Sequence, residues 1–418
     1  PIVEKKPVVV EKKPVVEKKP VVVEKKPVVV KQQTPEEIDA FVDNILKIPK
    51  MTEEELQESQ YKLIKSRKRE LPKLVQFYKT EFEKTHFKLK FPPLYATEHK
   101  KKGLLLQTRK DFIASYENEI ITIDTMVKCD GELIPIAKEK NFVTDYWFKD
   151  ATIRTYESLK FDPTNTIDED YNLFDGFVSD KYKYSDADIQ IILDHIMILV
   201  NHDIPSYNYV LSWLAHIAQK PHKKTNVAMI FKSDQGAGKN TFFDWFGKEI
   251  LGSKYYISTP SIEDLVGKHA NGTVNKILVN IDELSGKEAF AKASQLKNLM
   301  TATEVRHEKK TVDMIMLPNF SNYVGTTNGA TPLKVERGDR RTVLFECSDE
   351  KLIVNDVNGE NVKYFDNLYK AMAQEDIKSS FYLMLMDRDI TTFNTEKDRP
   401  ITELYKDVQS ATIPIIVH

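Results

Sequence analysis

The sequence predicts an α/β fold in which a phosphate-binding loop joins a buried strand to a helix. The first observation is residues 226–246, which read as an apolar run, a glycine-containing turn, a lysine and then a helical pattern. The second is another apolar run at 277–279 that is followed closely by an acidic pair. The third is a strand-like stretch that ends at Asn328. Together they place polar side chains directly after buried strands.

Length and composition limit the class of protein. A chain of 418 residues, 41% hydrophobic and 30% charged, predicts about two to four globular domains. No apolar run is long enough for a membrane span and the first residues do not resemble a signal peptide, so we expect a cytoplasmic protein. Cys129 and Cys347 are too few for a disulfide framework and lack zinc-ligand spacing, so we expect two buried thiols.

Residues 1–33 repeat the pattern PVV(V)EKK, with a proline in every unit. Proline at this density excludes a helix and disfavours a central strand, which predicts an extended spacer. The segment holds nine Lys and four Glu and is therefore +5, which leaves −7 for the rest of the chain. Because the chain begins at Pro1 inside this repeat, we expect a further N-terminal domain before it.

The residues between this repeat and the loop are expected to form helices and short strands. Thr34 caps a helix, and helices are expected to continue to residue 87, whereas short β-rich pieces follow from Leu104, with a hairpin turn at Asp130-Gly131. Apolar positions recur at helical spacing from Asp186 to Ala218. The basic stretches at 65–73 and 99–102 are read as solvated surface in preference to nucleic-acid contacts. Three histidines in the helical stretch receive no chemical role: His195, His202 and His216.

The loop itself carries the residues that phosphate binding needs. Gly236, Ala237 and Gly238 let backbone N–H groups point at an anion, and Lys239 would reach the β- and γ-phosphates. The common pattern is G-x-x-x-x-G-K-[ST], and this sequence departs from it at Ser233 and Asn240. Either Asn240 or Thr241 would supply the oxygen that helps hold Mg²⁺.

Two later strands add groups for hydrolysis. Asp282 would lie near Mg²⁺ and Glu283 would polarise the attacking water, since both follow an apolar strand. Asn328 would hold the water or the γ-phosphate, although a plain turn residue before Gly329 is the alternative.

Two basic features complete the pattern. A hairpin between 304 and 318 would present cations that follow a phosphate backbone, with a solvated turn as the alternative; the cations are Arg306, His307, Lys309 and Lys310. Arg340 and Arg341 precede a strand, and either would reach the nucleotide of a neighbouring subunit in a ring.

In this order and spacing, the loop with GKN, the strand that ends in Asp-Glu, the basic hairpin and the strand that ends in Thr-Thr-Asn resemble superfamily III helicases, in the branch of phage and large-DNA-virus primase-helicases. The resemblance covers about residues 140–350. It implies ATP and Mg²⁺ as cofactors, an AAA+ ATPase fold, a walker-type acidic pair at Asp282 and Glu283, and Asn328 as a γ-phosphate sensor. It also implies that the chain is the C-terminal part of a phage primase-polymerase.

Together, the residue patterns and the resemblance predict five segments and a set of partners. The segments are a proline-rich linker at 1–33, a mostly helical N-terminal region with some β structure at 34–140, a helical collar at 141–222, the ATPase/helicase domain at 223–350 and a small helical tail at 351–418. The expected partners are single-stranded DNA, further copies of the chain in a hexameric ring, and an N-terminal primase or polymerase domain.

The expected function is therefore an ATP-dependent DNA helicase or translocase in phage replication. The alternative from another class is a nucleotide-gated DNA-binding ring, or scaffold, that holds a primase-polymerase domain on its template without unwinding. A packaging or loader ATPase fits the compact order of the motifs less well. Stimulation of hydrolysis by single-stranded DNA, coupled to strand separation, distinguishes the first from the others.

Overall fold

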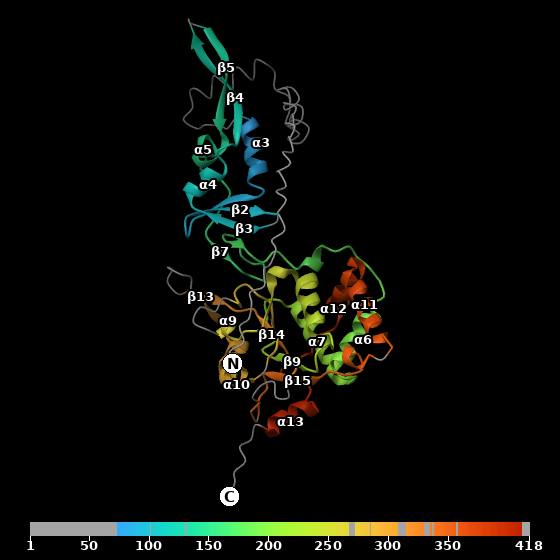
Figure 1. Cartoon of the computed structure of the whole chain (residues 1–418). Coiled ribbons are helices and arrows are strands. Elements are labelled where there is room, and N and C mark those ends of the chain that lie inside the picture. The colour runs from blue at the N-terminus through green and yellow to red at the C-terminus, as the bar shows by residue number, and fades with distance from the viewer. Residues whose placement is uncertain are drawn as a thin grey trace, which may run out of the picture. The chain divides into compact units, whose positions relative to one another are not determined.

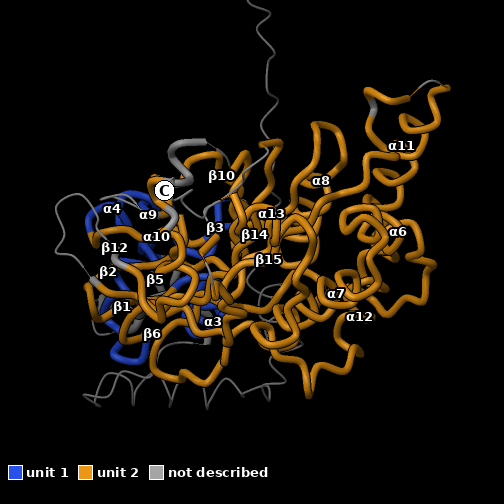
Figure 2. The backbone as a smooth tube through the Cα atoms, turned by 90° about the horizontal axis from the view of Figure 1, so that it is seen from below, with its two compact units in different colours: residues 1–86, 97–103, 110–153 blue, residues 87–96, 104–109, 154–418 orange. Residues whose placement is uncertain are grey.

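The computed structural model describes residues 73–100, 102–129, 132–266, 272–284, 286–307, 315–329, 335–336, 338–356 and 358–411 (Figure 1). The expected linker at 1–33, the first expected helices and the turn at 130–131 lie outside these residues. The chain divides into two compact units, drawn in different colours in Figure 2. Unit 1 comprises 1–86, 97–103 and 110–153, and unit 2 comprises 87–96, 104–109 and 154–418.

Unit 1 is built around an aromatic cluster. The ring of Phe82 lies 5.2 Å from that of Trp147, 5.4 Å from that of Phe142 and 6.2 Å from that of Phe112. The elements here are α3 (Lys73–Phe82), α4 (Arg109–Ser115), β4 (Ile120–Cys129), β5 (Glu132–Asn141), α5 (Phe142–Asp145) and η1 (Trp147–Lys149). Strands β4 and β5 pair antiparallel from Ile120 opposite Asn141 to Cys129 opposite Glu132, which confirms the predicted hairpin.

Two strands, β1 (His86–Leu89) and β2 (Leu94–His99), lie where the sequence did not predict them, whereas β3 (Gly103–Gln107) lies where β-rich pieces were expected from Leu104. With β6 (Thr155–Tyr156) these three strands form a sheet of order β3-β2-β1-β6. The expectation of a mostly helical region before residue 140 is therefore wrong for the described residues, which hold five strands and only two helices between 73 and 141. Short apolar runs suit either type of structure, and pairing with a neighbouring strand decides between them.

A five-stranded parallel sheet organises unit 2. Its order is β10-β11-β14-β9-β15, and every neighbouring pair is parallel. The strands are β9 (Ala228–Lys232), β10 (Tyr256–Thr259), β11 (Leu278–Ile281), β14 (Asn322–Thr327) and β15 (Thr342–Glu346). Because all five run in one direction, their carboxyl ends lie along one edge, where ligands bind in folds of this kind. The predicted α/β class is confirmed, with a parallel sheet.

Two separate cores cover the two faces of this sheet. Successive residues of β9 alternate between them: Ala228 and Ile230 belong to one core, Met229 and Phe231 to the other. This alternation is what a strand buried on both faces requires. The larger core includes side chains of α6 (Gln190–Leu199), α7 (Ile204–Gln219), α8 (Lys239–Trp245), α11 (Glu360–Ala373) and α12 (Glu375–Asp387). The smaller core includes side chains of α9 (Glu263–Val266), α10 (Gly286–Thr301) and α13 (Glu403–Ala411).

The C-terminal helices α11 and α12 are part of the larger core, not an appended tail. Phe381 of α12 is fully buried, and its ring lies 5.2 Å from that of Trp245 in α8. Figure 1 shows α6, α7, α11 and α12 gathered on one side of β9 and β14, with α9 and α10 on the other. Helix α8 continues as a π-helical segment, η3 (Phe246–Gly252).

The remaining elements are short. They are β7 (Leu159–Lys160), β8 (Tyr171–Asn172), η2 (Val178–Lys181), η4 (Ser253–Tyr255), η5 (Ile353–Asn355) and the hairpin strands β12 (Glu304–His307) and β13 (Ile315–Pro318). Among the described residues, none of the helices is long and apolar enough to cross a membrane.

Candidate functional site

Three polar segments meet at the carboxyl edge of the parallel sheet. The loop 233–238 follows β9, Asp282 follows β11 and Asn328 follows β14. Backbone hydrogen bonds extend the sheet past the strand ends, from Ser233 N to the Thr327 carbonyl (3.2 Å) and from Leu284 N to the Thr326 carbonyl (2.8 Å). The strand, loop and helix order predicted from the sequence is thus present, and the edge carries nearly all the residues predicted to act on a nucleotide.

The backbone of the loop depends on glycine. Gly236 and Gly238 have φ values of +99° and +81°, in the region that L side chains rarely adopt. A Cβ atom at Gly238 would also lie 2.6 Å from the His195 ring and 2.8 Å from the Phe365 ring. The loop therefore rests directly on α6 and α11, which leaves no room for a side chain at this point.

His195 supports the loop from below. It is fully buried, and burial lowers its pKa to about 4, so the ring is neutral near pH 7. Its Nε2 lies 3.3 Å from the Gly238 carbonyl oxygen and its Nδ1 lies 3.1 Å from the Tyr364 hydroxyl. A neutral ring satisfies both contacts if Nε2–H donates to the carbonyl and the tyrosine donates to Nδ1. The sequence interpretation gave this histidine no role.

Lys239 reaches across the loop to two strand ends. Its Nζ donates to the Ser233 carbonyl (3.0 Å), to the Ser233 hydroxyl and to Asn328 Oδ1 (3.1 Å). Lys239 is only 7% exposed, and this burial lowers the pKa of its ammonium group. A polyphosphate at this ammonium would oppose that shift, because a nearby negative charge favours the protonated lysine. Ser233, the first departure from the common loop pattern, thus supplies an oxygen for the lysine.

Cys347 lies beside the lysine at the end of β15. Burial raises the pKa of its thiol to about 12, and Lys239 and Ser233 are its neighbouring polar groups. The expected buried thiol is confirmed for this cysteine. The side chain of Cys129 lies outside the described part of the chain.

Asn240, the second departure, contacts the acidic residue of β11. Its Nδ2 donates to Asp282 Oδ1 at 2.6 Å, and its Oδ1 accepts from Thr326 Oγ1 (2.8 Å) and Asn280 Nδ2 (3.2 Å). The Thr326 hydroxyl also lies 3.0 Å from Asp282 Oδ1, so its single proton is shared between the two acceptor oxygens. The amide oxygen of Asn240 is thus occupied, and two donors orient Asp282 through one oxygen while its second oxygen stays available to a cation.

Thr241 points to a different neighbour. Its hydroxyl lies 3.4 Å from that of Tyr369 in α11, whereas Asn240 contacts β11 and β14. The two candidate metal ligands therefore face different parts of the site. Within the described residues, no group of three or more His, Cys, Asp or Glu side chains is placed to hold a metal ion. Mg²⁺ commonly uses one or two carboxylates together with substrate phosphates and water, and the second oxygen of Asp282 fits that role.

Glu283 follows Asp282 in the chain, and Asn328 lies next to Lys239. Glu283 is exposed and has a φ of +56°, a conformation that is uncommon for a residue with a side chain. The N–H of Leu284, one residue later, donates to the Thr326 carbonyl, and this hydrogen bond helps hold the backbone of Glu283 in its strained conformation. Asn328 is exposed and bonds to Lys239. Strained backbone of this kind is concentrated at functional sites.

The arginines lie at the opposite edge of the sheet. Arg340 and Arg341 precede β15, and the Arg341 carbonyl accepts from Ala228 N at the start of β9. Arg341 Nη1 donates to the Lys297 carbonyl at 3.2 Å, whereas the Arg340 side chain is 75% exposed, with Glu396 at 3.6 Å. The structure does not bring either arginine to the loop of its own chain.

The predicted basic hairpin is present as a backbone element. Glu304 to His307 of β12 pair antiparallel with Ile315 to Pro318 of β13, and Arg306 lies opposite Met316. Lys309 and Lys310 lie outside the described residues, as do the side chains of Arg306 and His307. The hairpin immediately precedes β14, so it too belongs to the amino edge of the sheet.

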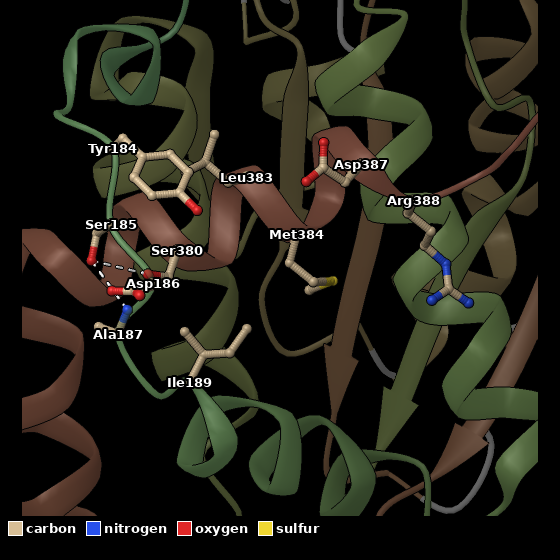
Figure 3. Close-up of a pocket in the computed structure, with 10 residues that line it drawn as sticks. All are labelled: Tyr184, Ser185, Asp186, Ala187, Ile189, Ser380, Leu383, Met384, Asp387 and Arg388. Atoms are coloured by element: carbon tan, nitrogen blue, oxygen red, sulfur yellow. Dashed lines mark hydrogen bonds between the residues drawn. The ribbon is translucent and has the colours of Figure 1, made fainter.

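A pocket of about 530 Å³ lies elsewhere in unit 2, between the segment 184–189 and α12 (Figure 3). Leu383 and Met384 of α12 line it together with Tyr184 and Arg388. None of its lining residues belongs to the loop or to the strand ends. We therefore assign the site to the edge of the sheet, where polar groups converge, and give this pocket no role.

Three residues of the site were not predicted from the sequence: His195, Asn280 and Thr326. Thr326 stands two positions before Asn328, so its place on the same strand was the available signal. Asn280 interrupts the apolar run of β11, where a polar side chain with no exposure needs a partner. His195 lies 43 residues before Gly238 in the chain, and no sequence pattern connects the two residues.

Comparisons with known proteins show what the chain is similar to. Residues 231–341 match a family of unknown function (DUF5906). The chain is similar to the DNA primase-polymerase of Nitratiruptor phage NrS-1, at 26% identity over 163 residues, which is 38% of this chain and 22% of that protein. It thus spans about a fifth of the length of that curated relative.

Solved structures show a related fold. Two apo structures of the NrS-1 C-terminal region superpose with a TM-score of 0.59 at 18% identity. The superposition covers 81% of this chain in both cases and 75% or 74% of the solved chain. At this identity the likeness concerns the fold.

Proposed function

We propose that unit 2 is a Mg²⁺-dependent ATPase that moves or unwinds DNA as part of a phage replication protein. The observation that supports it most directly is the convergence of three segments on one point. Lys239 of the loop bonds to Asn328, and Asn240, its neighbour, bonds to Asp282. These contacts join β9, β11 and β14 at the edge where parallel sheets bind ligands.

The residues divide the work of phosphoryl transfer among them. The loop amides bind the α- and β-phosphates, Lys239 reaches the β- and γ-phosphates, and Asn240 and Thr326 orient Asp282 for the cation. Mg²⁺ would neutralise charge on the β- and γ-oxygens. Glu283 takes a proton from the attacking water, and Asn328 orients that water or the γ-phosphate.

The DNA-related part of the proposal rests on the relative and on the basic hairpin. The NrS-1 protein is called a DNA primase-polymerase, and its C-terminal region shares the fold. We propose single-stranded DNA as the partner of the hairpin β12–β13, further copies of the chain as partners in a ring, and a primase-polymerase as the larger protein. The position of Arg340 away from its own loop favours a ring, since an arginine that acts on a neighbour must be exposed at another edge.

The first test concerns phosphate binding. Lys239→Ala should reduce binding of Mg²⁺·ATP to background in equilibrium titration, because the ammonium is the main charge partner of the phosphates. Lys248→Ala is a matched control, since Lys248 is an exposed lysine further along the same helical segment that pairs with Asp244. Equal ATP affinity in wild type and Lys239→Ala would refute the ATPase proposal.

The second test concerns DNA. ATP hydrolysis should rise when single-stranded DNA is added, and a forked duplex should be separated in a reaction that requires Lys239. Stimulation without strand separation would support a nucleotide-gated ring that holds DNA in place of a helicase. Hydrolysis that is indifferent to DNA would refute the DNA-motor part of the proposal and leave the ATPase part standing.

A further inference from the structure

One face of α11 runs along the phosphate loop. Phe365 and Tyr369 lie four residues apart and so share this face. Phe365 is 5% exposed and meets Gly238, where an added Cβ would lie 2.8 Å from its ring. Tyr369, one turn later, places its hydroxyl 3.4 Å from that of Thr241 in the first turn of α8. Side chains of α11 therefore contact both the last glycine of the loop and the first turn of α8.

Tyr369 differs from Phe365 in being open to solvent. It is 52% exposed, while Phe365 supports it from behind with ring centroids 6.3 Å apart at 33°. Its hydroxyl contact with Thr241 restrains the ring at the other end. A single exposed aromatic residue is ordinary on a protein surface. Here the ring is held on two sides and lies beside a loop that is built to bind phosphate.

The direction of a bound nucleotide follows from the contacts of the site. Lys239, Asp282 and Asn328 gather at the strand ends, and they are the groups suited to the γ-phosphate and the cation. Thr241 lies on the other side of the first turn of α8, toward α11 and away from those strand ends. The loop amides hold the α- and β-phosphates between the two. The nucleoside, attached at the α-phosphate, therefore leaves on the side of Thr241 and Tyr369.

We propose that Tyr369 is the stacking platform for the nucleobase. The inference rests on the proposed ATPase function and adds to it the group that recognises the base. Every base offers a flat π-face, so stacking of this kind tolerates all four bases. The site should therefore separate nucleotides from bare polyphosphate strongly, and separate ATP from GTP, CTP and UTP only weakly.

The test compares ATP with inorganic tripolyphosphate, which has the phosphates and no base. Both are titrated with Mg²⁺ into the full chain and into Tyr369→Ala, Tyr369→Phe and Lys239→Ala. Tyr369→Ala should weaken ATP binding by about 5- to 150-fold, the usual range for one stacked base, and change tripolyphosphate binding by less than about 2-fold. Tyr369→Phe keeps the ring and should bind ATP nearly as the wild type does. Tyr184→Ala is the control, because Tyr184 is 83% exposed and outside the site.

The outcomes separate this inference from the function on which it rests. If ATP binding depends on Lys239 but is unchanged in Tyr369→Ala, the stacking proposal is wrong and the ATPase proposal stands. Equal loss of ATP and tripolyphosphate in Tyr369→Ala would make the ring a support of the loop and also refute stacking. If neither ligand binds in a manner that depends on Lys239, both proposals fail.

Discussion

Asn240 stands where the common phosphate loop has serine or threonine, and its amide is used to orient a carboxylate. Its Nδ2 donates to Asp282 Oδ1 at 2.6 Å, while Thr326 and Asn280 occupy its own oxygen. A residue that orients a metal ligand changes metal affinity without touching the ion. If Asp282 binds Mg²⁺ as proposed, Asn240 would orient the metal ligand and would not itself contact the ion.

Replacing Asn240 tests this placement. Asn240→Ala removes one of the two donors to Asp282, so the Mg²⁺ concentration for half-maximal ATP hydrolysis should rise about 10- to 100-fold. Magnesium titration of the hydrolysis rate at saturating ATP measures it. Tripolyphosphate binding without metal is the internal control and should be unchanged, because it depends on Lys239. An unaltered magnesium requirement would show that Asp282 does not need the amide.

Acid should destabilise the protein through His195. Burial lowers the pKa of its ring to about 4, below the ordinary value of 6.5. Between these pH values the unfolded chain binds more protons than the folded one, so stability falls as the pH drops through this window. The loss from this residue is about 2 kcal/mol between pH 7 and pH 5.

The measurement is urea unfolding near pH 7 and near pH 5. His195→Gln has no titrating group, so its stability should depend less on pH than that of the wild type, even if it is less stable overall. His222→Gln serves as the control, because His222 is exposed. The same pH dependence in wild type and His195→Gln would contradict a buried neutral ring.

At the scale of elements, the loop 233–238 is held by helices that come both before and after it in the chain. His195 belongs to α6, and Tyr364, Phe365 and Tyr369 belong to α11. Next to α11, α12 packs Phe381 against three aromatic rings of α8 and η3. The C-terminal helices thus contact the loop or the helical segment that follows it, although they come after the last strand of the sheet.

Phe381→Ala tests the contribution of α12. The side chain is fully buried against Phe242, Trp245 and Phe246, so truncation should cost about 3–5 kcal/mol of unfolding free energy. Chemical denaturation of the whole chain gives this value. Met386→Ala, on the same helix and 40% exposed, should cost much less. If Phe381→Ala lost as little unfolding free energy as Met386→Ala, α12 would be only loosely attached to α8.

At the scale of the whole molecule, the two edges of the parallel sheet carry different chemistry. The carboxyl edge holds the loop, Asp282 and Asn328, whereas the amino edge holds Arg340, Arg341 and the hairpin β12–β13. A strand of five residues separates the arginines from the end of β15. In the proposed ring, an arginine at the amino edge would serve the phosphate site of another copy of the chain.

Mixing variants tests whether the site is shared. Arg340→Ala should bind ATP normally and hydrolyse it about 10³-fold more slowly or worse, which is the usual effect of losing an arginine finger. When it is mixed with Lys239→Ala protein, some interfaces pair an intact loop with an intact arginine, and activity should partly return. Arg341→Ala serves as the comparison, because its guanidinium already bonds to the Lys297 carbonyl. Full activity of Arg340→Ala alone would leave Arg340 as an ordinary partner of Glu396.

The sequence by itself determined the local features of this protein: a strand, loop and helix at 228–245, an acidic pair after β11, and an asparagine after β14. These features follow from neighbouring residues, since apolar runs predict buried strands and glycines permit a left-handed loop. The strands at 86–89 and 94–99 were missed because pairing between strands decided them. Tertiary structure alone brought His195 beneath Gly238, turned Asn240 toward Asp282 and placed the arginines at the opposite edge. Such contacts join residues that are distant in the chain, and only the order of parallel strands and the packing of helices against them bring those residues together.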